Sequence, residues 1–166
     1  GLTVYNQARG IRIKYAFLRV QERNYETRLL PLNDLKNNFG FFPTIKPVIE
    51  NFEMHRQADY EKNILMTRYN PTREEIVFHY TNTTPQWIRE IGRKAVQTWD
   101  ETFQRAGVKT RVKLDESFDI ALGDTRYSSI NLVESISTNS GLYGFGPSLF
   151  DPMTGEIISA TANVHI

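Results

Sequence analysis

The sequence contains no cysteine, and this absence removes several kinds of chemistry at once. The chain has no disulfide, no thiolate nucleophile and no cysteine-bound zinc. No apolar run approaches the roughly twenty residues of a membrane-spanning helix, so we expect no membrane span. An excess of charge of one sign is also missing, because 20 basic residues stand against 19 acidic ones. A net charge of +1 gives no general attraction to nucleic acid, and we expect no nucleic-acid partner.

The residues that are present indicate a globular chain with two regions. Of 166 residues, 40% are apolar and 12% aromatic, which is enough to bury a core. Residues 1–70 are predicted to be a β-rich N-terminal extension or pro-like region, with Ile11–Phe17 and Tyr25–Leu30 as candidate partner strands. Residues 71–166 carry the regular elements described next. The sequence therefore predicts a domain boundary near residue 70.

The clearest element is a helix predicted over Pro85–Ala106. Thr84 offers a hydroxyl for its N-cap, and Gly107 can take the left-handed conformation that ends it. Apolar residues recur every three or four positions and form one stripe: Ile88, Ile91, Ala95, Trp99, Phe103 and Ala106. This periodicity predicts a surface helix that packs on a sheet through the stripe, with Trp99 and Phe103 buried.

Short segments after the helix predict further strands. The segments are Val108–Leu114, Phe118–Leu122, Ile130–Val133 and Ile157–Ile166. Asp151–Gly155 has the composition of a turn, with aspartate first, proline second and glycine last. The final strand alternates apolar and polar residues and stops without a cap, so we interpret the chain as part of a longer parent protein. The predicted fold class is α+β, with one long helix covering a mixed sheet.

The familiar catalytic signatures are missing from the sequence. There is no Gly-rich phosphate loop, no Gly-x-Ser-x-Gly and no His-Glu-x-x-His. His55, His79 and His165 are far apart and lack metal-ligand spacing, and the acidic residues near the end do not match a calcium-binding loop. We therefore assign no catalytic residue and no metal ligand, and expect no cofactor in this chain.

Four segments in order resemble a bacterial family of large zinc metallopeptidases of the metzincin type. They are Ile76–Phe78, Pro85–Gly107, Asp124–Tyr127 and Gly144–Ile157. The last is the most specific, since family members have a similar Gly-Pro-Ser followed by an Asp-Pro-x-Thr-Gly-Glu-Ile hairpin shortly before the zinc helix. One departure is Thr125, where the family has a hydrophobic residue. The resemblance covers about ninety residues, whereas residues 1–70 resemble the family only loosely.

The resemblance implies a metzincin-like twisted mixed sheet over a long first helix, with the zinc helix after the last strand. That helix carries His-Glu-x-x-His-x-x-Gly-x-x-His, which would lie beyond Ile166. The chain would then be the N-terminal portion of a catalytic domain, inactive as given, in a parent that is a zinc metalloendopeptidase. Its partners would be a peptide or protein substrate and the remainder of its own catalytic domain. We favour a periplasmic or secreted location for the parent.

The resemblance also implies where a substrate would bind. In such enzymes an extended peptide pairs with the edge strand before the zinc helix, which by order along the chain is Gly144–Phe150 here. The candidate substrate-binding residues are Gly144, Phe145, Gly146, Pro147 and Ser148. Two other readings stay open: a β-rich protein-binding or interaction module without catalytic activity, and a degenerate relative that keeps the fold but has lost the zinc ligands.

Overall fold

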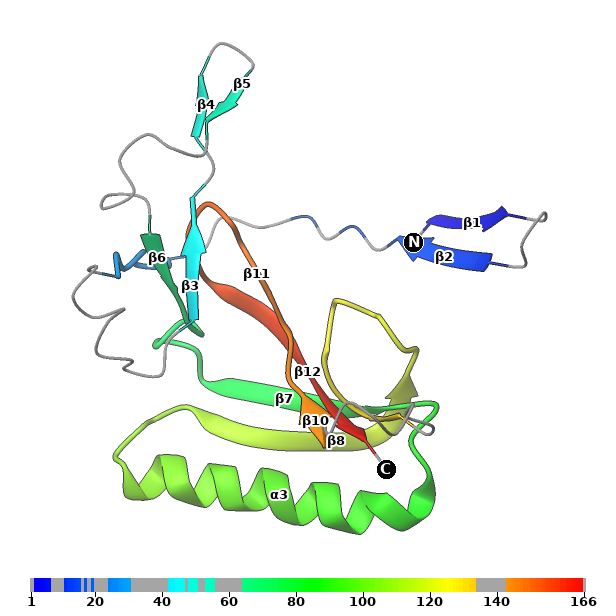
Figure 1. Ribbon diagram of the computed structural model, residues 1–166. Coiled ribbons are helices and arrows are strands. Elements are labelled where there is room, and N and C mark those ends of the chain that lie inside the picture. The colour runs from blue at the N-terminus through cyan, green and yellow to red at the C-terminus, as the bar shows by residue number, and fades with distance from the viewer. Residues whose placement is uncertain are drawn as a thin grey trace. The chain divides into compact units, whose positions relative to one another are not determined.

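The computed structural model describes residues 2–6, 11–15, 17, 19, 24–30, 42–46, 48–50, 53–55, 64–133 and 143–165. In these residues one helix and several strands form an α+β fold, as the sequence predicts (Figure 1). The chain divides into two compact units. The first holds Gly1–Arg19, Glu74–Pro147 and Ser159–Ile166, and the second holds Val20–Arg73 and Ser148–Ile158. The predicted boundary near residue 70 stays a prediction.

A mixed sheet forms the body of the first unit. Its strands are β7 (Glu75–Thr81), β8 (Arg111–Ile120), β9 (Ser128–Val133), β10 (Gly144–Phe145) and β12 (Ile157–His165). They lie in the order β10-β12-β9-β7-β8, and β11 (Ser148–Phe150) also pairs with β12. β7, β8, β9 and β12 run parallel, whereas β10 is antiparallel to β12. A separate antiparallel hairpin joins β1 (Leu2–Asn6) and β2 (Ile11–Tyr15), so the predicted partner of β2 is wrong.

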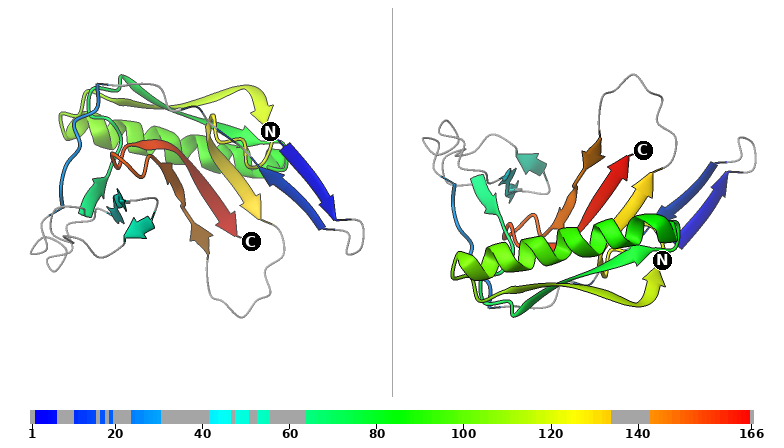
Figure 2. Two further views of the ribbon diagram at one scale, coloured as in Figure 1. Left: turned by 90° about the horizontal axis from the view of Figure 1, so that it is seen from above. Right: turned by 90° about the horizontal axis from the view of Figure 1, so that it is seen from below.

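The long helix α3 (Gln86–Arg105) runs beside β7 and β8 (Figure 2). Gly107 follows it with a φ of 74°, which confirms the predicted left-handed termination. The predicted cap is wrong, because Pro85 occupies the N-cap without a side-chain hydrogen bond. The Thr84 hydroxyl is buried and donates instead to the carbonyl of Ile130 at 3.1 Å. That hydroxyl connects the helix start to the sheet.

The face of α3 that meets the sheet also differs from the prediction. Ile88 and Val96 are the buried residues of the helix, whereas Ile91 and Trp99 are each 61% exposed and Phe103 is half-buried. Ile88 is buried as predicted, but the rest of the contact face is turned about the helix axis, so that Val96 is buried and Ala95 and Trp99 are exposed. Periodicity could not locate this face because polar residues take part in the contact.

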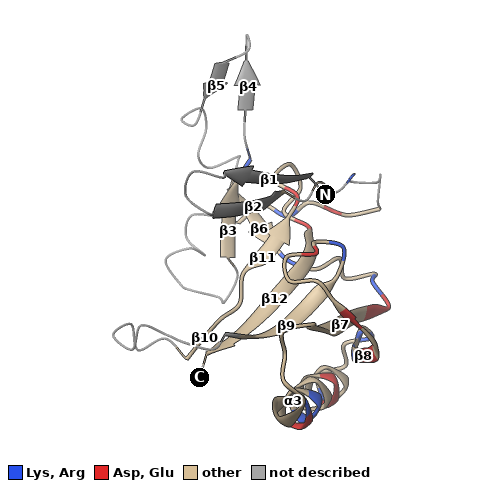
Figure 3. Ribbon diagram, turned by 90° about the vertical axis from the view of Figure 1, so that its right-hand side faces the viewer, with Lys and Arg blue, Asp and Glu red and all other residues tan. Residues whose placement is uncertain are grey.

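Three ion pairs connect α3 to β8 near the residues of the helix that contact the sheet. Arg89 pairs with Asp119 at 2.6 Å, Arg93 with Glu116 at 2.9 Å and Arg111 with Asp100 at 2.6 Å. Figure 3 shows both signs of charge side by side along α3. Glu116 and Asp119 both lie on β8, which is one continuous strand. The break predicted between Leu114 and Phe118 is absent.

Asp100 links the helix to the edge of β8 through two partners. Its carboxylate accepts from the Arg111 guanidinium and from the Val112 amide at 2.8 Å, and these bonds lower the pKa of Asp100 to about 2. A carboxyl whose pKa falls on folding stabilises the fold above its unfolded pKa of about 4, and that stabilisation is lost as pH falls towards 2.

We therefore expect Asp100→Asn to lower the urea midpoint of unfolding at pH 7. The deficit should shrink steadily between pH 4 and pH 2, because protonation removes the same interaction from the wild type. Urea titrations of both proteins at pH 7, 4 and 2 measure this difference. A deficit of equal size at all three pH values would show that the charge of Asp100 is not what matters.

The second unit contains two small antiparallel pairs and a turn. β3 (Phe42–Ile45) pairs with β6 (Ile64–Thr67), and β4 (Val48–Glu50) pairs with β5 (Glu53–His55). Of the predicted strand Tyr25–Leu30, Leu29 makes a single bridge to Leu65, and Leu30 and Leu65 are buried. The predicted turn at Asp151–Gly155 is confirmed, with Gly155 at a φ of 80° and its amide donating to the Asp151 carbonyl at 2.7 Å.

Candidate functional site

The sequence-predicted substrate strand begins with β10, which stands at one end of the strand order. Gly144 is opposite Val164 and Phe145 is opposite Asn163 in the antiparallel pairing with β12. Two further main-chain bonds continue the pairing, from the His165 amide to the Tyr143 carbonyl and from the Thr161 amide to the Pro147 carbonyl, each 2.9 Å. Among the described residues no strand pairs with the other side of β10.

The pairing determines which main-chain groups of this edge are available. In an antiparallel ladder, alternate residues direct both N–H and C=O towards the partner strand. The carbonyls of Tyr143 and Pro147 accept hydrogen bonds from β12. Phe145 lies two residues from each of them and therefore also directs its main-chain groups towards β12. The main-chain groups of Gly144 and Gly146 therefore point away from β12. Together they offer the alternating donors and acceptors that an added strand requires.

The space around the two glycines of the edge differs. A Cβ on Gly144 would lie 3.0 Å from the Asn163 carbonyl oxygen, so β12 approaches too closely for a side chain. A Cβ on Gly146 would have its nearest neighbour, the Thr161 carbonyl oxygen, at an ordinary 3.8 Å. The chain itself thus accounts for glycine at 144, whereas nothing in the described residues requires it at 146.

The five predicted site residues fall in two places. Gly144, Phe145, Gly146 and Pro147 are exposed and belong to the first unit, whereas Ser148 begins β11 in the second. Tyr143, which no sequence motif indicated, precedes them and is 87% exposed, and Phe145 is 59% exposed. In strand geometry residues 143 and 145 share one face of the edge, so two aromatic side chains accompany the main-chain groups that point away from β12.

A row of polar side chains crosses the sheet behind this edge. The Thr81 and Thr83 hydroxyls donate to Asn131 Oδ1 at 2.9 and 3.0 Å. Asn131 Nδ2 donates to Asn163 Oδ1 at 2.9 Å, and Asn163 Nδ2 donates to the Phe145 carbonyl at 3.1 Å. The alternation of β12 predicted that Asn163 shares a polar face, but no sequence pattern indicated its partners on β7, β9 and β10.

His79 and two carboxylates of β8 behave as structural groups. The imidazole of His79 is 4% exposed and lies against the rings of Phe118 and Tyr127, with centroids 4.7 and 4.9 Å away. The carboxylates of Glu116 and Asp119 hydrogen-bond to arginines, which lowers their pKa values. No group of three potential metal ligands occurs in the described part of the chain.

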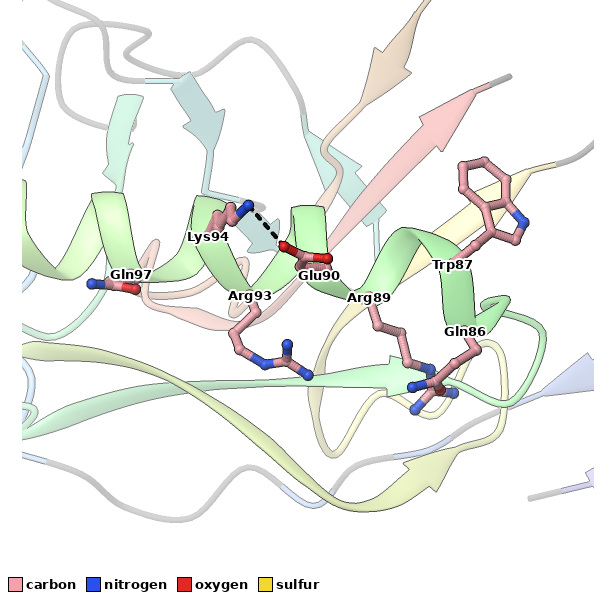
Figure 4. Close-up of a pocket in the computed structure, with 7 residues that line it drawn as sticks. All are labelled: Gln86, Trp87, Arg89, Glu90, Arg93, Lys94 and Gln97. Carbon is pink, nitrogen blue, oxygen red and sulfur yellow. Dashed lines mark ion pairs between the residues drawn. The ribbon is translucent and has the colours of Figure 1, made fainter.

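A pocket also lies along α3 (Figure 4). Its lining residues are Gln86, Trp87, Arg89, Glu90, Arg93, Lys94 and Gln97. Arg89 and Arg93 hold carboxylates of β8, and Lys94 pairs with Glu90 at 2.8 Å. With all of its lining on one helix and its cations paired, this pocket offers no free charge to a ligand, and the β10 edge is the better candidate.

Comparison of the chain with protein-family models, with curated proteins and with solved structures gives no match. Within the described residues, no helix is both long and apolar enough to cross a membrane.

Proposed function

We propose that this chain is the scaffold and substrate-strand portion of a zinc metallopeptidase of the metzincin type, whose zinc-binding helix lies beyond Ile166. The observation that carries the proposal is β10: an antiparallel strand at the sheet edge, with the main-chain groups of Gly144 and Gly146 directed outwards. Further support comes from one long helix beside a mixed sheet, and from the motif segment Gly144–Ile157 forming the edge strand and the turn that lead into β12.

The role of this chain in such an enzyme is to hold the substrate extended. A peptide laid along β10 would accept from the N–H groups of Gly144 and Gly146 and donate to their carbonyls, as in other cases of strand addition. The described residues contain no group of three potential metal ligands. The zinc ligands and the general base would come from the segment beyond Ile166, and no chemical step is assigned to residues of this chain.

The test uses the parent protein and residues 1–166 side by side. We expect the parent to contain one zinc per chain and to cleave unfolded protein substrates. Residues 1–166 should do neither after dialysis against a chelator. Glu→Gln in the His-Glu-x-x-His motif of the parent should abolish cleavage and leave the zinc in place, because the glutamate serves as the base and not as a ligand.

A zinc-loaded parent that cleaves no peptide would contradict the proposal, and so would a parent sequence without the zinc motif. The second outcome would favour a protein-binding module, the alternative function. That alternative is supported by the same free edge and by the exposed side chains of Tyr143 and Phe145, which suit binding without catalysis. Capture of extended peptides without cleavage would identify it.

A further inference from the structure

We infer that Asn163 is a positioning residue, which holds the β10 edge in the orientation that receives an extended peptide. The effect of Asn163 on substrate binding rests on the proposed function. Its hydrogen bond to β10 is a property of the fold and does not depend on that function. β10 has two residues and is flanked by Gly146, so its own pairing with β12 provides few hydrogen bonds. A strand this short and rich in glycine has little intrinsic order.

The side chain of Asn163 adds a bond where the ladder is weakest. Its Nδ2 donates to the Phe145 carbonyl oxygen at 3.1 Å. This carbonyl belongs to the set directed at β12, and holding it there keeps the neighbouring groups of Gly144 and Gly146 directed outwards. The bond therefore acts on the same main-chain groups that would contact a substrate.

The orientation of the Asn163 amide is in turn imposed from the interior of the sheet. Asn131 is 4% exposed; its Oδ1 accepts from the Thr81 and Thr83 hydroxyls, and its Nδ2 donates to Asn163. Asn163 then presents Oδ1 to Asn131 and Nδ2 to Phe145. Asn131 is buried and Asn163 half-buried, and in this arrangement each amide group along the row meets a partner of the matching kind. The order of the β7–β9 interior is thereby transmitted to the edge.

The decisive variant is Asn163→Asp, which keeps the acceptor for Asn131 and removes the donor to Phe145. At neutral pH a carboxylate would face the Phe145 carbonyl oxygen, and we expect exchange of the His165 amide, which bonds to the Tyr143 carbonyl, to accelerate about tenfold or more. Below about pH 4 the protonated carboxyl can donate again, and the exchange rate relative to wild type should return towards one. A role limited to packing would give no such pH dependence.

Two matched variants complete the exchange experiment. Asn163→Ala should accelerate exchange of His165 by a similar factor at every pH, since it has no donor in any state. Ser129→Ala removes the 3.0 Å bond to Thr161 on the same face of the sheet but does not reach β10, and it should leave His165 unchanged. Unchanged exchange in Asn163→Asp, or equal acceleration in Ser129→Ala, would overturn the inference.

In the parent enzyme, Asn163→Asp should raise KM for an extended peptide at least fivefold at neutral pH and leave kcat within about twofold. This division is expected because the variant disturbs the edge that binds substrate and not the reacting groups. A fall in kcat at unchanged KM would overturn the positioning role. If the parent shows no peptidase activity at all, the proposed function fails, whereas the exchange measurements still decide whether Asn163 holds β10.

Discussion

Valine in place of Gly146 is expected to lower kcat/KM of the parent enzyme on the order of ten- to a hundredfold, with zinc content unchanged. The branched side chain would stand beside the main-chain groups that an incoming peptide must approach to within hydrogen-bond distance, and a displacement of about 1 Å can cost this much. The chain itself tolerates the change, since a Cβ at 146 meets only the Thr161 carbonyl oxygen at 3.8 Å and Gly146 is not among the glycines with positive φ.

Two further variants make this result interpretable. Met153→Val places the same side chain on an exposed position of the Asp151–Gly155 turn and should leave kcat/KM unchanged. Gly144→Ala is expected to weaken the pairing of β10 itself, because its Cβ would lie 3.0 Å from the Asn163 carbonyl oxygen. Wild-type cleavage by the Gly146→Val enzyme would remove β10 from the substrate-binding site.

Truncation of Tyr80 to alanine should lower the free energy of unfolding by about 3–5 kcal/mol, the usual range for a large buried aromatic side chain. Tyr80 has no exposed surface, and its hydroxyl donates to the Arg89 carbonyl of α3. The Arg89 guanidinium lies 4.8 Å from the centre of the ring. Tyr80, on β7, thus contacts both the main chain of α3 and the arginine that pairs with Asp119 of β8. Urea unfolding measures the loss of stability.

The same contact explains the glycine in the middle of α3. A Cβ on Gly92 would lie 2.6 Å from Tyr80 Oη, so we expect Gly92→Ala to destabilise by roughly 1–3 kcal/mol through overpacking, against its better helix propensity. The cost should be smaller in a Tyr80→Phe background, where Oη is absent.

Tyr143→Ala, an exposed aromatic control, should change stability by about 0.5 kcal/mol or less. Equal losses for Tyr80→Ala and Tyr143→Ala would refute the role given to Tyr80.

Much of the fold could be predicted because local signals agreed with the tertiary structure. Apolar alternation identified β12, and turn composition identified Asp151–Gly155. The helix was located to within one residue at each end, since Pro85 and Gly107 impose backbone conformations by themselves. The edge position of the segment that begins with β10 was expected only from the family resemblance.

The failures have one physical origin, which is contact between polar groups distant in sequence. Helical periodicity assumes that apolar residues face the sheet, but Arg89, Arg93 and Asp100 bond to β8 and turn α3 so that Trp99 is exposed. Thr84 looked like a cap because a hydroxyl before a proline often is one. Its hydroxyl donates instead to the carbonyl of Ile130. Ile130 is far away in the sequence, so no local pattern could indicate this contact.

The sequence by itself therefore determined the α+β class and the positions of most elements, because these depend on local conformational preference and on the alternation of apolar residues. Only the tertiary structure decided which face of α3 meets the sheet, why Gly92 and Gly144 are glycines, and which residues hold the edge strand. Those features depend on groups such as Thr81, Asn131 and Asn163, which lie up to 82 positions apart in the chain and are adjacent only once the strands are ordered.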